Sequence, residues 1–139
     1  MTAVLVDSNV LLDLLTQDPL WCDWSAQHLA AAADRARLVI NPIIYAEISV
    51  HFTRIEDLDA ALPTAMLARE PLPFAAGFLA AKAHLAYRQR GGSKVTALPD
   101  FFIGAHAAIA GYQLLTRDAA RYRTYFPRLP LIAPDHAAQ

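Results

Sequence analysis

Short apolar runs that lack polar alternation constrain the fold of this chain more than any other feature. They lie at residues 3–7, 38–40 and 113–116, and a possible last one lies at 130–133. A strand that is apolar throughout is buried on both faces, and such strands are typical of parallel sheets covered by helices on each side. The sequence therefore predicts an α/β fold, a three-layer α/β/α sandwich with a short, mainly parallel central sheet.

Helical patterns separate these runs, and we find neither an internal repeat nor a low-complexity linker. We expect one domain over residues 1–139. The predicted helices cover residues 9–16, 20–34, 43–53, 56–67, 75–90, 99–111 and 119–125. Pro63 must lie near a break or kink of the fourth helix, because proline removes a backbone donor.

The composition limits the classes of partner. Apolar residues make up 55% of the chain and charged residues only 18%, so some apolar surface is expected to be buried against another chain. The formal net charge is −1, so any nucleic acid must be bound by local basic patches.

The sequence also indicates the compartment. The single cysteine, Cys22, allows no internal disulfide, and the N-terminal apolar run lacks a preceding basic stretch and is soon interrupted by Asp7. The longest uncharged run, residues 101–116, is too short to span a membrane. We therefore expect a cytoplasmic protein without membrane association.

Polar residues follow the predicted strands. Asp7 and Asp118 come one or two residues past a strand, and Asn41 follows a third strand. Ligands of open α/β sheets bind outside the carboxyl ends of the strands. These side chains are therefore the first candidates for a functional site.

Two further acids are placed to join them. Glu47 lies on a helix face between Ile44 and Ile48, and Asp100 begins a helix after Pro99. Each acid also has a plain structural explanation, since Asp7, Asp100 and Asp118 could cap helices and Glu47 could reach solvent or a base such as Arg54.

Clustered carboxylates raise one another's pKa unless a cation compensates, and oxygen-only clusters suit Mg²⁺ or Mn²⁺. Such an ion activates water and stabilises charge on a phosphoryl oxygen, which is what phosphodiester hydrolysis requires. No serine lies in a recognisable nucleophile motif. The five histidines and Cys22 show no spacing typical of zinc ligands.

In order and spacing, four segments resemble PIN-domain ribonucleases, in particular the VapC toxins of bacterial toxin–antitoxin pairs. They are VDSNVLL at 6–12, AE at 46–47, PDFFIGAHA at 99–107 and LLTRD at 114–118. The resemblance covers essentially the whole chain. It implies a PIN-like sandwich and a Mg²⁺- or Mn²⁺-dependent endoribonuclease, the toxin component of a type II, VapBC-like pair.

The resemblance also assigns residues. It implies that the catalytic, metal-binding acids are Asp7, Glu47, Asp100 and Asp118, with Asp7 and Asp100 the usual direct ligands. Asn9 and Thr116 match polar positions that hold these acids in place. Gly104 and His106 depart from the small apolar residues that are more usual there, and we expect His106 to point away from the metal or line the cleft. We interpret Asp13 as a solvated helix residue.

RNA must be held by cations. Arg88, Arg90 and Lys94 surround the loop that leads to Asp100, and other candidates flank Asp118, namely Arg117, Arg121 and Arg123. These residues either grip phosphates or complement helix ends in solvent. Three aromatic residues either stack on unpaired bases or belong to the core, namely Tyr87, Phe102 and Tyr122.

Trp21 and Trp24 are either core residues or interface anchors, and we expect at least one in a partner contact. The resemblance implies a cognate antitoxin, whose Arg or Lys enters the acidic cleft, and a homodimer.

Two alternative functions stay open. A haloacid-dehalogenase-like phosphatase also begins with a strand and an aspartate, but needs a second acid where this chain has Asn9. The other alternative is a PIN-like module that lacks catalytic activity and binds RNA or protein.

Overall fold

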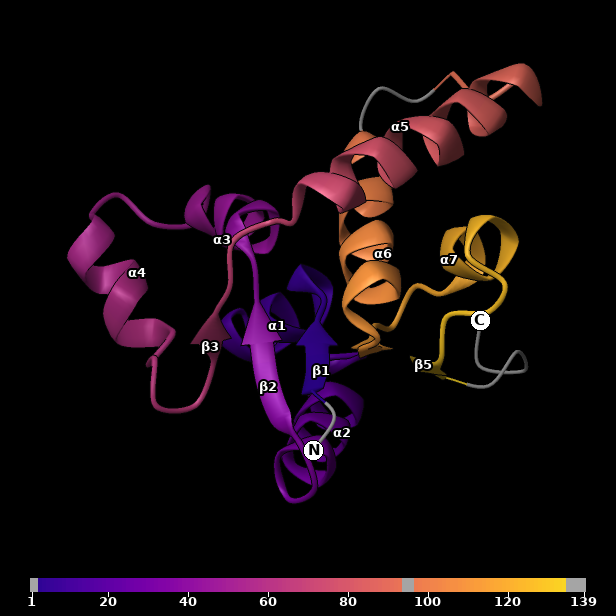
Figure 1. Ribbon diagram of the computed structural model, residues 1–139. Helices are drawn as coiled ribbons and strands as arrows, with labels where there is room; N and C mark the ends of the chain where they lie inside the picture. The colour runs from indigo at the N-terminus through magenta and orange to yellow at the C-terminus, as the bar shows by residue number, and fades with distance from the viewer. Residues whose placement is uncertain (1–2, 94–96, 135–139) are drawn as a thin grey trace.

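A parallel sheet of five strands, in the order β3-β2-β1-β4-β5, forms the centre of the computed structural model, which describes residues 3–93 and 97–134 (Figure 1). The strands are β1 (Ala3–Val6), β2 (Arg37–Ile40), β3 (Ala68–Arg69), β4 (Gln113–Leu115) and β5 (Leu131–Ile132). The helices are α1 (Ser8–Leu15), α2 (Cys22–Ala33), α3 (Pro42–Ser49), α4 (Ile55–Ala61), α5 (Phe74–Gln89), α6 (Leu98–Ala110) and α7 (Ala120–Tyr125). Every described strand pairing is parallel.

β1 occupies the middle of the sheet because it is apolar throughout, and none of its residues is more than 2% exposed. Leu5 is in register with Val39 of β2 on one side and with Leu114 of β4 on the other. The backbone N–H of Asp7 donates to the carbonyl of Leu115 at 2.9 Å. The carboxyl ends of β1 and β4 therefore lie side by side, which brings Asp7 next to the residue that follows β4.

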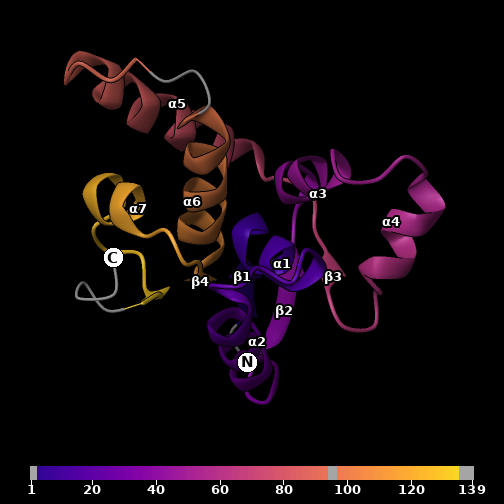
Figure 2. The same ribbon diagram turned by 180° about the vertical axis from the view of Figure 1, so that it is seen from behind.

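Helices cover both faces of the sheet. α1 and α2 pack together on one face, in front of the strands in Figure 2. α6 contacts β4 on the other face, and α5 packs on α6 and extends beyond the sheet (Figure 1). The predicted three-layer α/β fold is confirmed. Within the described ranges, no helix has the length and apolar character needed to cross a membrane.

Local sequence explains why strands turn directly into helices at this edge. Asn41 caps α3, since its side-chain oxygen accepts from the backbone N–H of Ile44 at 2.9 Å and Pro42 supplies a helical φ at the first turn. Asp7 caps α1 in a similar way, through the N–H of Ser8. The capping residues thereby gather at the carboxyl edge of the sheet.

The expected helix over residues 56–67 is wrong in its second half. α4 ends at Ala61, and Leu62 leaves the helical region with φ −120° and ψ 69°, because a following proline disfavours helical backbone. The chain then forms β3, in which Ala68 pairs with Val39. A two-residue strand has no apolar run of its own, so the sequence analysis missed it.

Candidate active site

Asp7 is the centre of the polar contacts at the end of β1. It is 3% exposed, and its Oδ2 accepts hydrogen bonds from the hydroxyls of Thr116 and Tyr122, both at 2.9 Å. The amide of Asn9 reaches the same oxygen at 3.4 Å, while Oδ1 accepts from the backbone N–H of Ser8 at 2.8 Å. The carboxylate is therefore held from both sides by neutral donors.

The surroundings nevertheless disfavour the charge of Asp7. Burial, followed by the negative charge of Asp100, raises the pKa of Asp7 to about 7, and the hydrogen bonds from Thr116 and Tyr122 offset these effects only in part. Glu47 adds a further repulsion. A carboxyl group with this pKa is half protonated near neutral pH, and a bound cation would restore its ionised form.

Glu47 comes from α3 and is half-buried. Its Oε1 accepts a hydrogen bond from the hydroxyl of Ser8 at 2.8 Å. Burial raises the pKa of Glu47, and the charge of Asp100 acts in the same direction. Ser8 thus links two acids, because its N–H binds Asp7 while its hydroxyl binds Glu47.

Asp100 lies in the first turn of α6, where its side chain is 30% exposed. Arg121 of α7 donates from Nη1 to Oδ2 of Asp100 at 2.6 Å. Burial still raises the pKa of Asp100, Arg121 lowers it, and the charge of Asp118 raises it again. Asp118 itself is exposed beside the end of β4.

Asp100 is thus the electrostatic centre of the four acids, here called the acidic quartet (Asp7, Glu47, Asp100 and Asp118). Its charge raises the pKa of Asp7 and of Glu47, and its own pKa is raised by Asp118. Within residues 3–93 and 97–134, no three acidic, His or Cys side chains are close enough together to enclose a metal ion. The quartet interacts through its charges without forming a closed cage.

Thr116 and Asn9, which are the predicted supporting residues, both contact Asp7. The hydroxyl of Thr116 accepts from the amide of Asn9 at 3.2 Å and from the backbone N–H of Asp118 at 3.2 Å, which directs its one proton to Asp7. The side-chain oxygen of Asn9 accepts from the N–H of Arg117 at 3.3 Å. These contacts connect α1 with the loop after β4.

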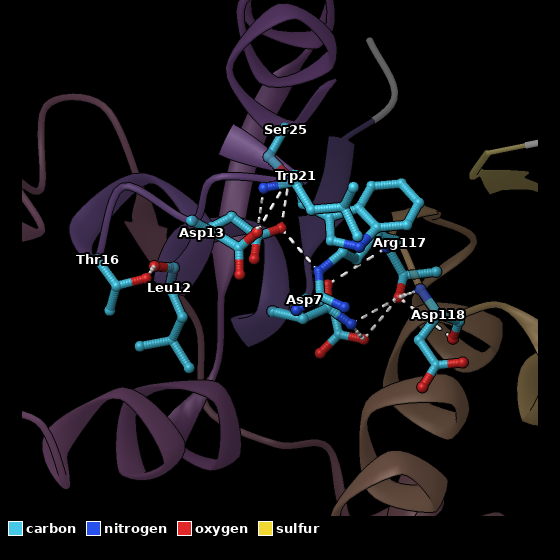
Figure 3. A network of polar contacts seen from close by, with 12 residues as sticks. Asp7, Leu12, Asp13, Thr16, Trp21, Ser25, Arg117 and Asp118 are labelled. Carbon is cyan, nitrogen blue, oxygen red and sulfur yellow. Dashed lines mark hydrogen bonds and ion pairs between the residues drawn. The ribbon is translucent and has the colours of Figure 1, made fainter. Parts of the chain in front are cut away.

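Arg117 points to another partner, Asp13 of α1. Its Nε donates to Oδ2 of Asp13 at 2.8 Å, and the hydroxyl of Ser25 donates to the same oxygen at 2.7 Å (Figure 3). Asp13 is 2% exposed, so its interpretation as a solvated residue is wrong. It lies on the side of α1 that faces α2, and the guanidinium of Arg117 also lies over Trp21, 5.6 Å from the ring centre.

The other predicted cations are spread around the site. Arg88 and Arg90 are exposed at the end of α5, and Arg90 lies over the ring of Tyr125. Lys94 lies outside the described residues. Arg121 contacts Asp100, as described above. Arg90 and Arg121 lie over the rings of Tyr125 and Tyr87, which contact each other, whereas Arg117 binds Asp13.

The expected partner residues lie on α2 and just before it. Trp21 and Trp24 are partly exposed and make an edge-to-face contact, with ring centres 6.1 Å apart. Trp24 also stacks on His28 at 4.2 Å. Both tryptophans keep exposed area that a partner chain could contact.

The sequence analysis missed two contributors, Tyr122 and Ser8. Tyr122 was weighed as a base-stacking or core residue, yet its buried hydroxyl binds Asp7. The sequence places no serine in a nucleophile motif, and it predicts no other role for Ser8. No sequence signal marks the contact of Tyr122, whereas the position of Ser8 between Asp7 and Asn9 could have suggested its role.

Comparisons with known proteins bear on the family and the fold of this chain. The sequence profile of the PIN domain matches residues 4–127. Among solved structures, VapBC2 from Rickettsia felis, bound to a DNA fragment from its promoter, has a chain similar to this one, with a TM-score of 0.74 and 18% identity over 96% of this chain and 100% of that chain. For VapBC-1 from nontypeable Haemophilus influenzae the TM-score is 0.71, with 17% identity over 95% of this chain and 98% of that chain.

FitAcB from Neisseria gonorrhoeae gives a TM-score of 0.70 and 17% identity over 96% of this chain and 99% of that chain. A search of curated protein sequences returns no match. The structural likenesses support the fold, and the profile covers the chain from β1 to the end of α7. The chain therefore belongs to the PIN-domain family.

Proposed function

We propose that this protein is a Mg²⁺- or Mn²⁺-dependent endoribonuclease and the toxin component of a type II, VapBC-like toxin–antitoxin pair. The observation that carries the proposal is the buried carboxyl of Asp7, whose pKa is raised to about 7 by burial and by Asp100. Such a site is stabilised by a cation more than by any neutral ligand, since a cation restores the charged form.

The residues present fit a hard divalent ion. Their donors are carboxylate oxygens only, and Mg²⁺ binds with one or two carboxylates while it keeps several waters, so an open arrangement suits it. Asp7 and Asp100 would hold the ion, with Glu47 and Asp118 beside them. When bound, the ion would activate a water and stabilise charge on a phosphoryl oxygen.

The protein's own residues would orient the acids. Thr116 and Tyr122 fix Oδ2 of Asp7, and Ser8 fixes Glu47. The cations proposed to hold the RNA backbone are Arg88, Arg90, Lys94, Arg117 and Arg121. Because Arg117 is bound to Asp13, its contribution would come from the edge of its guanidinium that Asp13 leaves uncovered.

The proposed partner is a cognate antitoxin. The similar chains come from structures described as VapBC and FitAB complexes, some with DNA, and one is described as a toxin–antitoxin complex from Klebsiella pneumoniae. For this chain we propose that Trp21 or Trp24 contacts the antitoxin, that the toxin forms a homodimer, and that it acts in the cytoplasm.

The test is RNA cleavage by the purified chain with Mn²⁺ and with EDTA. Asp7→Asn should abolish cleavage, and EDTA should abolish it in the wild type. Asp57→Asn, an identical change at an exposed acid of α4, serves as the matched control and should leave cleavage intact. Wild-type protein that binds RNA without cleaving it in Mn²⁺ would favour the non-catalytic module.

A phosphatase of the haloacid-dehalogenase type remains the weaker candidate. That chemistry needs a second acid at position 9, where the amide of Asn9 instead binds Thr116 and Asp7. If the protein hydrolysed a small phosphomonoester in the cleavage assay and did not cleave RNA, the phosphatase would become the stronger candidate and the ribonuclease the weaker one.

A further inference from the structure

Arg121 brings a positive charge into contact with the acidic quartet. Its Nη1 lies 2.6 Å from Oδ2 of Asp100, and the two side chains are 27% and 30% exposed. Among the residues that the structure describes, no other Lys or Arg side chain makes an ion pair with a member of the quartet. The guanidinium therefore occupies an oxygen that a metal ion would use.

The choice of Asp100 as its partner has an electrostatic consequence. The charge of Asp100 raises the pKa of Asp7 and of Glu47. The charge of Asp118 in turn raises the pKa of Asp100. A cation placed on this residue offsets repulsion across the whole quartet, whereas the same cation on the exposed Asp118 would offset little. Arg121 is thus bound to the acid whose charge acts on two other members of the quartet.

Two neighbouring residues of α7 contact the quartet. Tyr122 donates a neutral hydrogen bond to Asp7, while Arg121 donates a charged one to Asp100. The guanidinium of Arg121 also lies over the ring of Tyr87 on α5, 5.4 Å from its centre. This second contact gives Arg121 a place to remain when it leaves Asp100.

We propose that Arg121 serves as an internal counterion of the quartet, bound to Asp100 until a divalent cation displaces it. The inference rests on the proposed metal dependence. Loading of the site is then an exchange of one cation for another, and the affinity for metal is reduced by the strength of the ion pair. If Arg121 only held Asp100 in place, its removal would weaken metal binding instead.

Mn²⁺ binding tests the inference without any measurement of activity. Free Mn²⁺ gives an electron paramagnetic resonance signal that disappears on binding, so titration of the purified chain yields a dissociation constant. We expect Arg121→Gln to bind Mn²⁺ about two- to fivefold more tightly than the wild type, the range that corresponds to a partly exposed ion pair. Arg121→Lys keeps the charge and should stay near wild-type affinity.

Arg128→Gln is the matched control, because it removes the same charge at an exposed position. It should leave the affinity unchanged. Equal or weaker Mn²⁺ binding by a folded Arg121→Gln would overturn the inference while leaving the proposed function intact. Failure of the wild type and Arg121→Gln alike to bind Mn²⁺ would overturn the proposed function as well.

A second measurement uses the wild-type chain and does not depend on the folding of a variant. The Nε–Hε resonance of Arg121 in a nitrogen-15 spectrum should shift as Mg²⁺ is added, because the guanidinium exchanges its partner. A resonance that stays in place while Mg²⁺ binds would show that the ion pair persists, which contradicts displacement.

Discussion

The side-chain amide of Asn41 donates to Nδ1 of His106 at 3.0 Å, which ties the cap of α3 to the middle of α6. The two side chains are 2% and 1% exposed. Because α3 carries Glu47 and α6 carries Asp100, this buried contact joins two helices that bear members of the quartet. His106 acts here, away from the quartet itself.

This contact predicts a pH-dependent stability. Burial lowers the pKa of His106 below its ordinary value of 6.5, and the charge of Glu70 opposes this only in part. The unfolded chain then binds the proton more tightly, so the contribution of His106 is complete above the ordinary pKa and is lost as the pH falls.

We expect a difference in the free energy of unfolding between the wild type and His106→Gln. This difference should be about 1 kcal/mol smaller at pH ~5.5 than at pH ~7.5. Urea unfolding of both proteins measures this difference. Asp7 is present in both, so its own pH dependence cancels in the subtraction. Parallel pH curves would contradict the prediction.

Asp7→Asn should stabilise the metal-free protein. The pKa of Asp7 lies at about 7, well above its ordinary value of 3.8, so the ionised carboxyl opposes folding increasingly as the pH rises between these values. We expect a gain of about 1–2 kcal/mol near pH ~8, which shrinks toward pH ~4.5. Urea unfolding in EDTA checks it, with the exposed Asp57→Asn as control. A loss of stability at high pH would refute it.

Tyr122→Phe should shift the pH dependence of metal binding. Without the hydroxyl, Asp7 loses a hydrogen bond that lowers its pKa, so the carboxyl ionises at higher pH. We expect the acidic limb of Mn²⁺ binding to move upward by about 0.5–1 pH unit. Tyr125→Phe is the control, since the ring of Tyr125 packs on Phe101 and Tyr87. Coincident curves for Tyr122→Phe and the wild type would count against the role of this hydrogen bond.

Arg117→Gln should destabilise the fold through Asp13. The change leaves a carboxylate that is 2% exposed without its cation, and such losses cost about 2–4 kcal/mol. A second substitution, Asp13→Asn, removes the stranded charge and should restore part of the stability. Thermal or urea unfolding of the single and double variants measures both effects. Additive losses in the double variant would be inconsistent with this explanation.

Two glycines in helices should respond oppositely to alanine. A Cβ at Gly104 would lie 2.5 Å from the ring of Phe126, so Gly104→Ala should cost about 1–3 kcal/mol. A Cβ at Gly77 meets nothing within 4 Å, so Gly77→Ala in α5 should add about 0.5–1 kcal/mol of stability. Unfolding midpoints measure the pair. Similar effects at both positions would show that packing against Phe126 is not the reason for Gly104.

Sequence reasoning was sufficient for the features that depend on local pattern. The apolar runs identified β1, β2 and β4, and the position of Asp7 after the first run identified the edge at which it lies. The contacts that join distant segments were not accessible in this way. Arg121 reaches Asp100 and Tyr122 reaches Asp7 because α7 packs beside α6.

Burial of charge was similarly hidden. Asp13 occupies a helix position that is ordinary for a solvated acid, and only the packing of α1 against α2, together with Arg117, makes it a core residue. The sequence did not predict β3, because this strand is defined by its pairing with β2 and not by a pattern in its own two residues.

The central position of β1 also bears on synthesis. The donors that hold Asp7, Thr116 and Tyr122, lie 109 and 115 residues further along the chain. The ribosome must therefore translate at least as far as Tyr122 before Asp7 can acquire both partners. A nascent chain that ends before Thr116 carries Asp7 without either of these donors.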